Sequence, residues 1–151
     1  MPKNVVRLYA VVLALLAGLS TGTAGAVELK VLSTEAMRPT LEELAPAFEA
    51  ASKNKLVIAY ATDADVEKKV ASDETIDVAI LTKPGADKLV KNAKMVGGTA
   101  EVVAKGSSPD LIYVVGSSFA CEKPLAAKAL IDFLTGPAAK KVFQAKGLQT
   151  S

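Results

Sequence analysis

The sequence predicts an α/β domain in which a mostly parallel, doubly wound sheet carries helices on both faces. Strand-like and helix-like segments alternate three times between residues 28 and 92, and this alternation is typical of parallel strands joined by right-handed crossovers. The second and third strand segments are continuously apolar, as strands inside a parallel sheet are. Half of the 151 residues are hydrophobic, and there are only 10 Gly and 7 Pro. This composition favours a folded globule over a disordered chain.

The N-terminal segment predicts export. Lys3 and Arg7 precede the apolar run 8–19, and Ala24-Gly25-Ala26 matches the small-residue pattern of a signal-peptide cleavage site. A transmembrane anchor is the alternative, but it needs about 20 apolar residues, which is longer than this run. No Cys follows the cleavage site, so the pattern is not that of a lipoprotein. We therefore expect a signal peptide over residues 1–26, a single domain over residues 27–151 and a periplasmic location.

The first strand and helix have clear periodicity. Glu28–Leu32 alternates polar and apolar residues, as a half-buried strand does. Met37–Ser52 follows as a helix, which Pro46 should bend. Its apolar face consists of Leu41, Leu44, Ala45, Phe48 and Ala51. Leu56–Tyr60 is continuously apolar and predicts a strand buried on both faces.

Two further helices are expected around a third strand. Thr62 or Asp63 can cap a short helix that ends near Ser72. Residues 76–81 then form a third buried strand, and residues 84–92 form a third helix.

The second half of the chain departs from this alternation. Residues 99–105 and 111–115 resemble strands, and the turn-forming cluster 106–110 between them predicts a hairpin. A strongly apolar helix covers residues 125–134, and Thr135-Gly136-Pro137 ends it and starts another. Gly147 is placed to end that last helix.

Composition excludes several kinds of chemistry. The chain has no His, no Trp and one Cys, which removes His-based acid–base catalysis, His-containing zinc sites and an intrachain disulfide. With 18 basic and 16 acidic residues, little net charge is available to hold nucleic acid or an anionic membrane. Cys121 is expected to be a small buried hydrophobe or a site for an intermolecular bridge. We expect no enzyme activity and no cofactor.

A resemblance to a known family rests on three segments. Leu41–Glu49, Asp77–Leu81 and the block from Ala126 to Leu148 resemble the substrate-binding proteins of molybdate-type ABC transporters. The resemblance implies two α/β lobes joined by hinge strands, but the segment for the second lobe would fall between Lys105 and Leu111. Only a turn is present there. The resemblance therefore implies a single lobe of a periplasmic-binding-protein-like fold, with a hairpin in place of the second lobe.

The same resemblance implies a ligand site at the helix starts that follow the first two strands. In the family, hydroxyls and backbone N–H groups there hold an oxyanion, aided by the positive end of the helix dipole. The first-loop serine corresponds to Ala36, and a second-loop ligand serine corresponds to Asp63. Glu35, Asp63 and Asp65 would repel a dianion and satisfy the free N–H groups themselves. The candidate ligand-binding residues are Ser33, Thr34, Ala36, Tyr60, Thr62 and Asp63.

Other readings of these residues stay open. Ser and Thr at these positions also serve as turn formers and helix caps. The carboxylates Glu35, Asp63 and Asp65 could collect a hard cation, but their spacing matches no calcium loop, so no metal site is expected. Tyr60 could line the ligand face or simply pack.

Together these features predict an exported solute-binding-protein-like domain with a degenerate oxyanion site. Its partner would be a small anion or another small ligand, or a periplasmic protein, or a second copy of itself. Exposed apolar surface is expected at the strand-end loops once the second lobe is absent. The alternative is a functional but weak binder of molybdate, tungstate or sulfate. Nucleic-acid binding is not expected, nor is membrane insertion after signal removal.

Overall fold

Residues 27–150 are described by a computed structural model, in which five strands form one sheet. The expected signal peptide lies outside the described residues. The strands are β1 (Glu28–Thr34), β2 (Lys55–Ala61), β3 (Val78–Thr82), β4 (Glu101–Lys105) and β5 (Ile112–Ser117). Their order is β2-β1-β3-β5-β4. β1 is parallel to both β2 and β3, and only β5 runs against its neighbours. The predicted mostly parallel sheet is confirmed.

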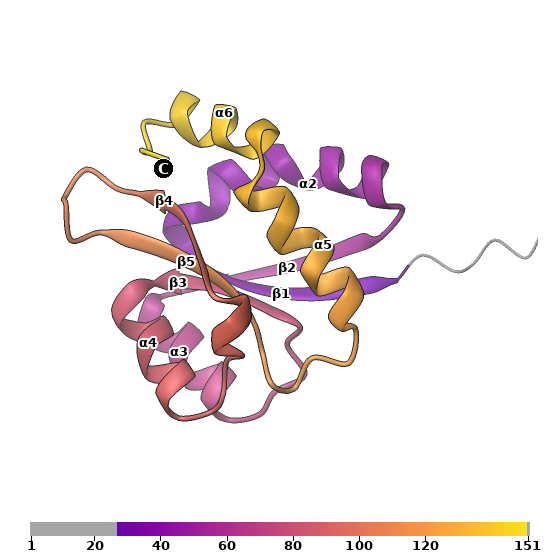
Figure 1. The fold of residues 1–151 in the computed structure, drawn as a ribbon, viewed down its shortest axis with the longest axis vertical. Helices are drawn as coiled ribbons and strands as arrows, with labels where there is room; N and C mark the ends of the chain where they lie inside the picture. The colour runs from indigo at the N-terminus through magenta and orange to yellow at the C-terminus, as the bar shows by residue number, and fades with distance from the viewer. Residues whose placement is uncertain (1–26, 151) are drawn as a thin grey trace, which may run out of the picture.

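Helices cover both faces of this sheet (Figure 1). They are α2 (Arg38–Ser52), α3 (Asp63–Ala71), α4 (Lys83–Lys91), α5 (Pro124–Thr135) and α6 (Pro137–Ala145), with short 3-10 turns η2 (Glu35–Met37) and η3 (Gly97–Thr99). α2, α5 and α6 lie on one face, and α3 and α4 lie on the other. The predicted doubly wound arrangement is therefore confirmed.

Local sequence signals account for where several helices begin and end. The Thr62 hydroxyl accepts the Asp65 N–H at 3.2 Å, which is the predicted cap of α3. Pro124 and Pro137 begin α5 and α6, where the missing N–H of proline costs nothing. Gly147 has a φ of 81° just after α6, a conformation that a residue with a Cβ rarely adopts.

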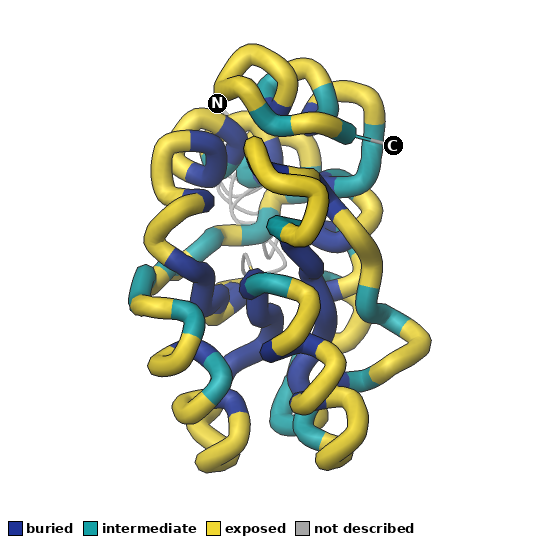
Figure 2. Tube along the Cα trace, turned by 90° about the vertical axis from the view of Figure 1, so that its left-hand side faces the viewer, coloured by how far each residue is buried: buried dark blue, intermediate teal, exposed yellow. Residues whose placement is uncertain are grey.

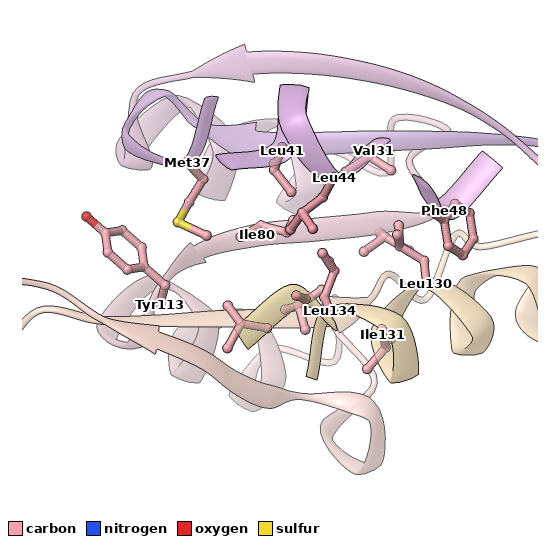
Figure 3. Packing of buried hydrophobic residues seen from close by; sticks show 14 of the residues in the cluster. Val31, Met37, Leu41, Leu44, Phe48, Ile80, Tyr113, Leu130, Ile131 and Leu134 are labelled. Atoms are coloured by element: carbon pink, nitrogen blue, oxygen red, sulfur yellow. The ribbon is translucent and has the colours of Figure 1, made fainter. Parts of the chain in front are cut away.

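Two apolar clusters, one on each face, make up the core. The first contains Leu41, Leu44 and Phe48 of α2, which face Leu130 and Leu134 of α5 (Figure 3). The Phe48 ring meets the Phe133 ring edge to face, with 5.5 Å between their centroids. The second cluster packs α3 and α4 against the other side of the sheet. In the tube view, the buried stretches run through the middle of the molecule (Figure 2).

The prediction that residues 56–60 are buried on both faces is wrong. β2 is an edge strand, because β3 pairs with β1 rather than with β2. α2 half-covers Leu56, Ile58 and Tyr60, whereas Val57 and Ala59 on the opposite face are exposed. Val57 remains 42% exposed. A continuous apolar run thus marks a strand here without marking its position in the sheet.

β4 and β5 form the predicted hairpin, joined by a turn in which the Gly106 N–H donates to the Leu111 carbonyl at 2.7 Å. A Cβ on Gly106 would lie 2.4 Å from the Leu111 side chain, so any other residue would require that side chain to move. Only this turn separates β4 from β5, and the described residues form a single sheet with its flanking helices, a shortened form of the fold. Within these residues, no helix is long and apolar enough to cross a membrane.

Cys121 lies in the loop between β5 and α5 and is half-buried. It packs against the first apolar cluster, and the Lys123 N–H donates to its sulfur at 3.4 Å. Burial raises the pKa of the thiol. These contacts agree with the expectation of a packing role.

Candidate functional site

The candidate site lies at the carboxyl edge of the sheet, where β1, β2 and β3 all end. Thr34 and Ala61 are paired at the ends of β1 and β2, and Thr82 at the end of β3 pairs with Tyr113 of β5. β1 is flanked by β2 on one side and β3 on the other, so the chain reverses its winding direction around β1. Open α/β sheets bind ligands at such a switch point, outside the carboxyl ends of the strands.

The residues that carry the first-loop hydroxyls are largely buried at this edge. Ser33 is fully buried and Thr34 is 6% exposed, because β1 extends through both residues. The Ser33 hydroxyl donates to the Thr34 carbonyl at 3.1 Å. Thr34 starts η2 without a side-chain cap bond, and Ala36 in η2 is exposed. The first loop therefore presents a methyl group at Ala36 rather than a hydroxyl.

The second loop uses its polar groups internally. The Thr62 hydroxyl donates to the Asp65 carboxylate at 2.9 Å and accepts the Asp65 N–H. The cap of α3 therefore uses both the Thr62 hydroxyl and the Asp65 carboxylate.

Asp63 reaches across to the next strand end. Its carboxylate accepts the Thr82 N–H at 3.3 Å and also the Thr82 hydroxyl. Thr82 is the residue from which α4 begins, so this carboxylate lies at the positive end of a helix. Burial, and after it the negative charge of Asp63, raises the pKa of Tyr113. Asp63 lies at the start of α3, as predicted, and its carboxylate also reaches the start of α4.

Arg38 lies at the ends of β1 and β2, where it contacts Tyr60 and Glu35. Its guanidinium lies 4.2 Å from the centroid of the Tyr60 ring, a cation–π distance. It also forms two hydrogen bonds with Glu35, at 2.8 and 2.9 Å, and lies 3.9 Å from Glu42. The hydrogen bond to Arg38 holds the pKa of Glu35 below its usual value. Glu35 is therefore neutralised by Arg38 rather than by helix N–H groups.

Tyr60 is held under this arginine. Burial raises its pKa, and within residues 27–150 its buried hydroxyl has no hydrogen-bond partner. Sequence reasoning did not identify Arg38, Thr82 or Tyr113 at this edge. The spacing of Glu35 and Arg38, three residues apart, is a signal that could have identified the first of these. No local signal links Asp63 to Thr82, because the contact spans 19 residues.

Large apolar side chains are not exposed at the strand-end loops. Within the described part of the chain, the exposed large hydrophobic residues are Val27, Val57, Val90, Val102, Phe119 and Leu125. None of these lies in the loops that contain Ala36 and Asp63. Among these described residues, there is also no cluster of three or more His, Cys, Asp or Glu side chains suited to a metal.

We expect Asp63→Ser to lower the pKa of Tyr113 toward its ordinary value of 10.0, because the change removes the nearby negative charge. A pKa raised by folding favours the folded state below pH 10 or so, and this contribution is lost as the pH rises through the folded-state value. Tyrosinate absorbance of residues 27–151 in a Tyr60→Phe background isolates Tyr113, because the third tyrosine, Tyr9, lies outside this segment. Asp65→Ser is the matched control and should leave the titration in place; an unchanged titration in Asp63→Ser would contradict the assignment.

Polar groups gather at the carboxyl ends of the parallel strands, where open α/β sheets bind ligands. The sequence agrees: residues 29–108, more than half of the chain, match the family described as bacterial extracellular solute-binding protein. The chain belongs to this family. A comparison with curated proteins finds no match.

Solved structures of oxyanion-binding proteins share the fold. The substrate-binding domain of a putative molybdenum ABC transporter from Clostridium difficile is similar with a TM-score of 0.77, covering 83% of this chain and 100% of that one. The periplasmic molybdate-binding protein of Azotobacter vinelandii has a TM-score of 0.74, and the match covers 82% of this chain and 99% of that one. The sulfate-binding protein SubI from Mycobacterium tuberculosis H37Rv has a TM-score of 0.67, and the match covers 82% of this chain and 87% of that one. Each is 11% identical to this chain, so the likeness concerns the fold.

Proposed function

We propose that this chain is an exported solute-binding-protein-like domain with a degenerate oxyanion site, which acts in the periplasm by binding a small ligand or a protein partner. The function is binding rather than catalysis. The observation that carries the proposal is the Asp63 carboxylate, which accepts the Thr82 N–H and hydroxyl at the start of α4. A carboxylate of the chain itself thus lies at the helix starts where the resemblance expects an oxyanion, and it occupies the neighbouring donors of Thr82.

Electrostatics supports this proposal. Two like charges 4 Å apart near a protein surface repel by about 4 kcal/mol, and a dianion is repelled about twice as strongly. A charge-assisted hydrogen bond from one hydroxyl contributes only about 1.5–3 kcal/mol. The carboxylate at position 63 therefore outweighs any single hydroxyl that remains at this edge.

A second candidate is a weak oxyanion binder of an ABC transport system. It is favoured by the fold shared with molybdate- and sulfate-binding proteins and by the hydroxyls of Thr62 and Thr82 at the carboxyl edge. This candidate requires Asp63 to leave Thr82 when an anion arrives.

A thermal-shift panel of oxyanions, amino acids and metal ions separates the two candidates. A ligand at 100 times its Kd stabilises the folded state by about 2.7 kcal/mol, which raises Tm by roughly 10 °C in a domain of this size. We expect molybdate, tungstate and sulfate to give no such shift. A shift with these anions, absent with chloride at matched ionic strength, would favour the weak oxyanion binder.

Export is tested by the mass of the mature protein. We expect cleavage after Ala26, so the periplasmic protein should begin at Val27, because the basic residues, the short apolar run and Ala24-Gly25-Ala26 form a signal peptide. Intact mass spectrometry measures this directly. Ala24→Leu together with Ala26→Leu should block cleavage, and a periplasmic protein that retains residues 1–26 would contradict the proposal.

A further inference from the structure

We propose that a hollow on the α3 face of the sheet binds a small apolar amino acid in its zwitterionic form. The hollow has a volume of about 170 Å³ and is formed by β1, β2, the end of α3 and the loop before β3. It shares no residue with the carboxyl-edge site, so ligand binding here is independent of the proposed function. Its lining includes Lys30, Val57, Ala59, Lys69, Glu74 and Ile76.

One face of the sheet is uncovered at β2. Parallel sheets normally carry helices on both faces. On this face, α3 and α4 pack mainly against β1, β3 and β5, and their apolar cluster includes neither Val57 nor Ala59. Both residues are exposed. Apolar side chains therefore face solvent at a place where the fold normally has a covering element, and such surface is typical of a binding site.

Hydrogen bonds hold the wall of the hollow in place. The Ile76 N–H donates to the Glu74 carbonyl at 2.7 Å, and the Asp77 N–H donates to the Lys30 carbonyl at 2.8 Å. Ile76 is only 7% exposed, so this loop is packed against the sheet. Pockets for drug-sized ligands have volumes of about 300–1,000 Å³. The hollow is therefore preformed, and its smaller volume favours a ligand with few heavy atoms.

Three charged residues without an ion-pair partner line this apolar hollow. They are Lys30, Lys69 and Glu74, and among residues 27–150 none of them has an opposite charge within ion-pair distance. The neighbouring carboxylate of Asp73 is already paired with Lys94 at 2.7 Å. Lysine side chains can lay their stems along apolar surface while the ammonium stays in water. The rim thus offers two positive groups and one negative group around an apolar floor.

Charge complementarity selects the ligand. An α-amino acid carries a carboxylate and an ammonium on one carbon atom, beside its side chain. The carboxylate matches Lys30 and Lys69, the ammonium matches Glu74, and an apolar side chain covers Val57 and Ala59. A purely apolar molecule would leave all three charges unpaired. An anion without an ammonium would be repelled by Glu74.

NMR titration of the purified mature protein with leucine tests the site. We expect saturable binding with a Kd of about 1 mM or below, together with shifts of the backbone amide signals of Val57, Ala59 and Ile76. The amide signals of Thr62 and Thr82 at the carboxyl edge should stay in place. Shifts confined to that edge would overturn this site while leaving the proposed function intact. Absence of saturable leucine binding also overturns the proposal.

Two analogues with the carbon skeleton of leucine separate its two charges. Isocaproate lacks the ammonium, and isopentylamine lacks the carboxylate. We expect each to bind roughly tenfold more weakly than leucine, because each loses one charge-assisted contact. An analogue that binds as tightly as leucine would contradict recognition of a zwitterion.

Variants assign each charge to its partner. Glu74→Gln should weaken leucine binding roughly fivefold but should not weaken isocaproate binding, because isocaproate has no ammonium to pair with Glu74. Lys30→Gln combined with Lys69→Gln should weaken leucine and isocaproate but not isopentylamine. Glu101→Gln is the matched control, since Glu101 is exposed on β4, and it should change none of these affinities. Equal losses of leucine and isocaproate binding in Glu74→Gln would contradict the assignment.

Discussion

Ala36→Ser combined with Asp63→Ser is expected to give this protein measurable molybdate binding. Each restored charge-assisted hydrogen bond contributes about 1.5–3 kcal/mol, and loss of the carboxylate also frees the Thr82 N–H and hydroxyl. The gain should be partial. The second lobe that would enclose the anion is absent, so water and salt continue to screen the site. Isothermal titration calorimetry at fixed ionic strength measures the change.

Ala36→Ser with Asp63→Ala is the matched control for this pair. It removes the same negative charge and frees the same donors but supplies one hydroxyl fewer. If relief of repulsion were the whole effect, the two double variants would bind equally. No gain in either variant would mean that the missing lobe, and not positions 36 and 63, abolishes oxyanion binding.

Asp77→Ala is expected to reduce the free energy of unfolding by about 2–5 kcal/mol, measured by urea denaturation. Asp77 is 1% exposed, and its carboxylate accepts the Lys30 N–H at 2.9 Å and the Glu122 N–H at 3.3 Å. The Lys123 ammonium lies 3.8 Å away. Alanine would leave these donors without an acceptor where β1 meets the loop after β5.

Asp87→Ala is the matched control for Asp77→Ala. Its carboxylate pairs with Lys83 at 2.8 Å on the surface of α4, with the Asp87 side chain 62% exposed. Exposed pairs contribute about 0–1 kcal/mol. Equal losses in the two variants would contradict the role of Asp77 as a buried link between β1 and the loop after β5.

Most elements of the fold could be predicted from local signals. Alternation in Glu28–Leu32, the cap at Thr62 and the break at Gly136-Pro137 each act within a few residues, and the structure has a strand or helix end at each of them. The position of β2 could not be predicted this way. Whether an apolar strand is central or at an edge depends on which strand pairs next to it, and β3 pairs with β1 across more than 40 residues of sequence.

The candidate site could be predicted in location but not in detail. The strand ends and helix starts follow from the β-α alternation, and Ala36, Thr62 and Asp63 do lie in these loops. The contacts that occupy the polar groups of the site are formed only in the folded chain: Asp63 accepts from Thr82, and Arg38 stacks on Tyr60. Ser33 and Thr34 are buried because β1 continues through them. Their polar side chains instead suggest that the strand ends before them.

Titration of the unmutated protein with molybdate by calorimetry tests the central claim, that the chain itself occupies its oxyanion site through Asp63. We expect no measurable heat of binding, or binding too weak to saturate, at an ionic strength where the folded state is intact. Tight, saturable binding of molybdate by the unmutated protein would contradict it.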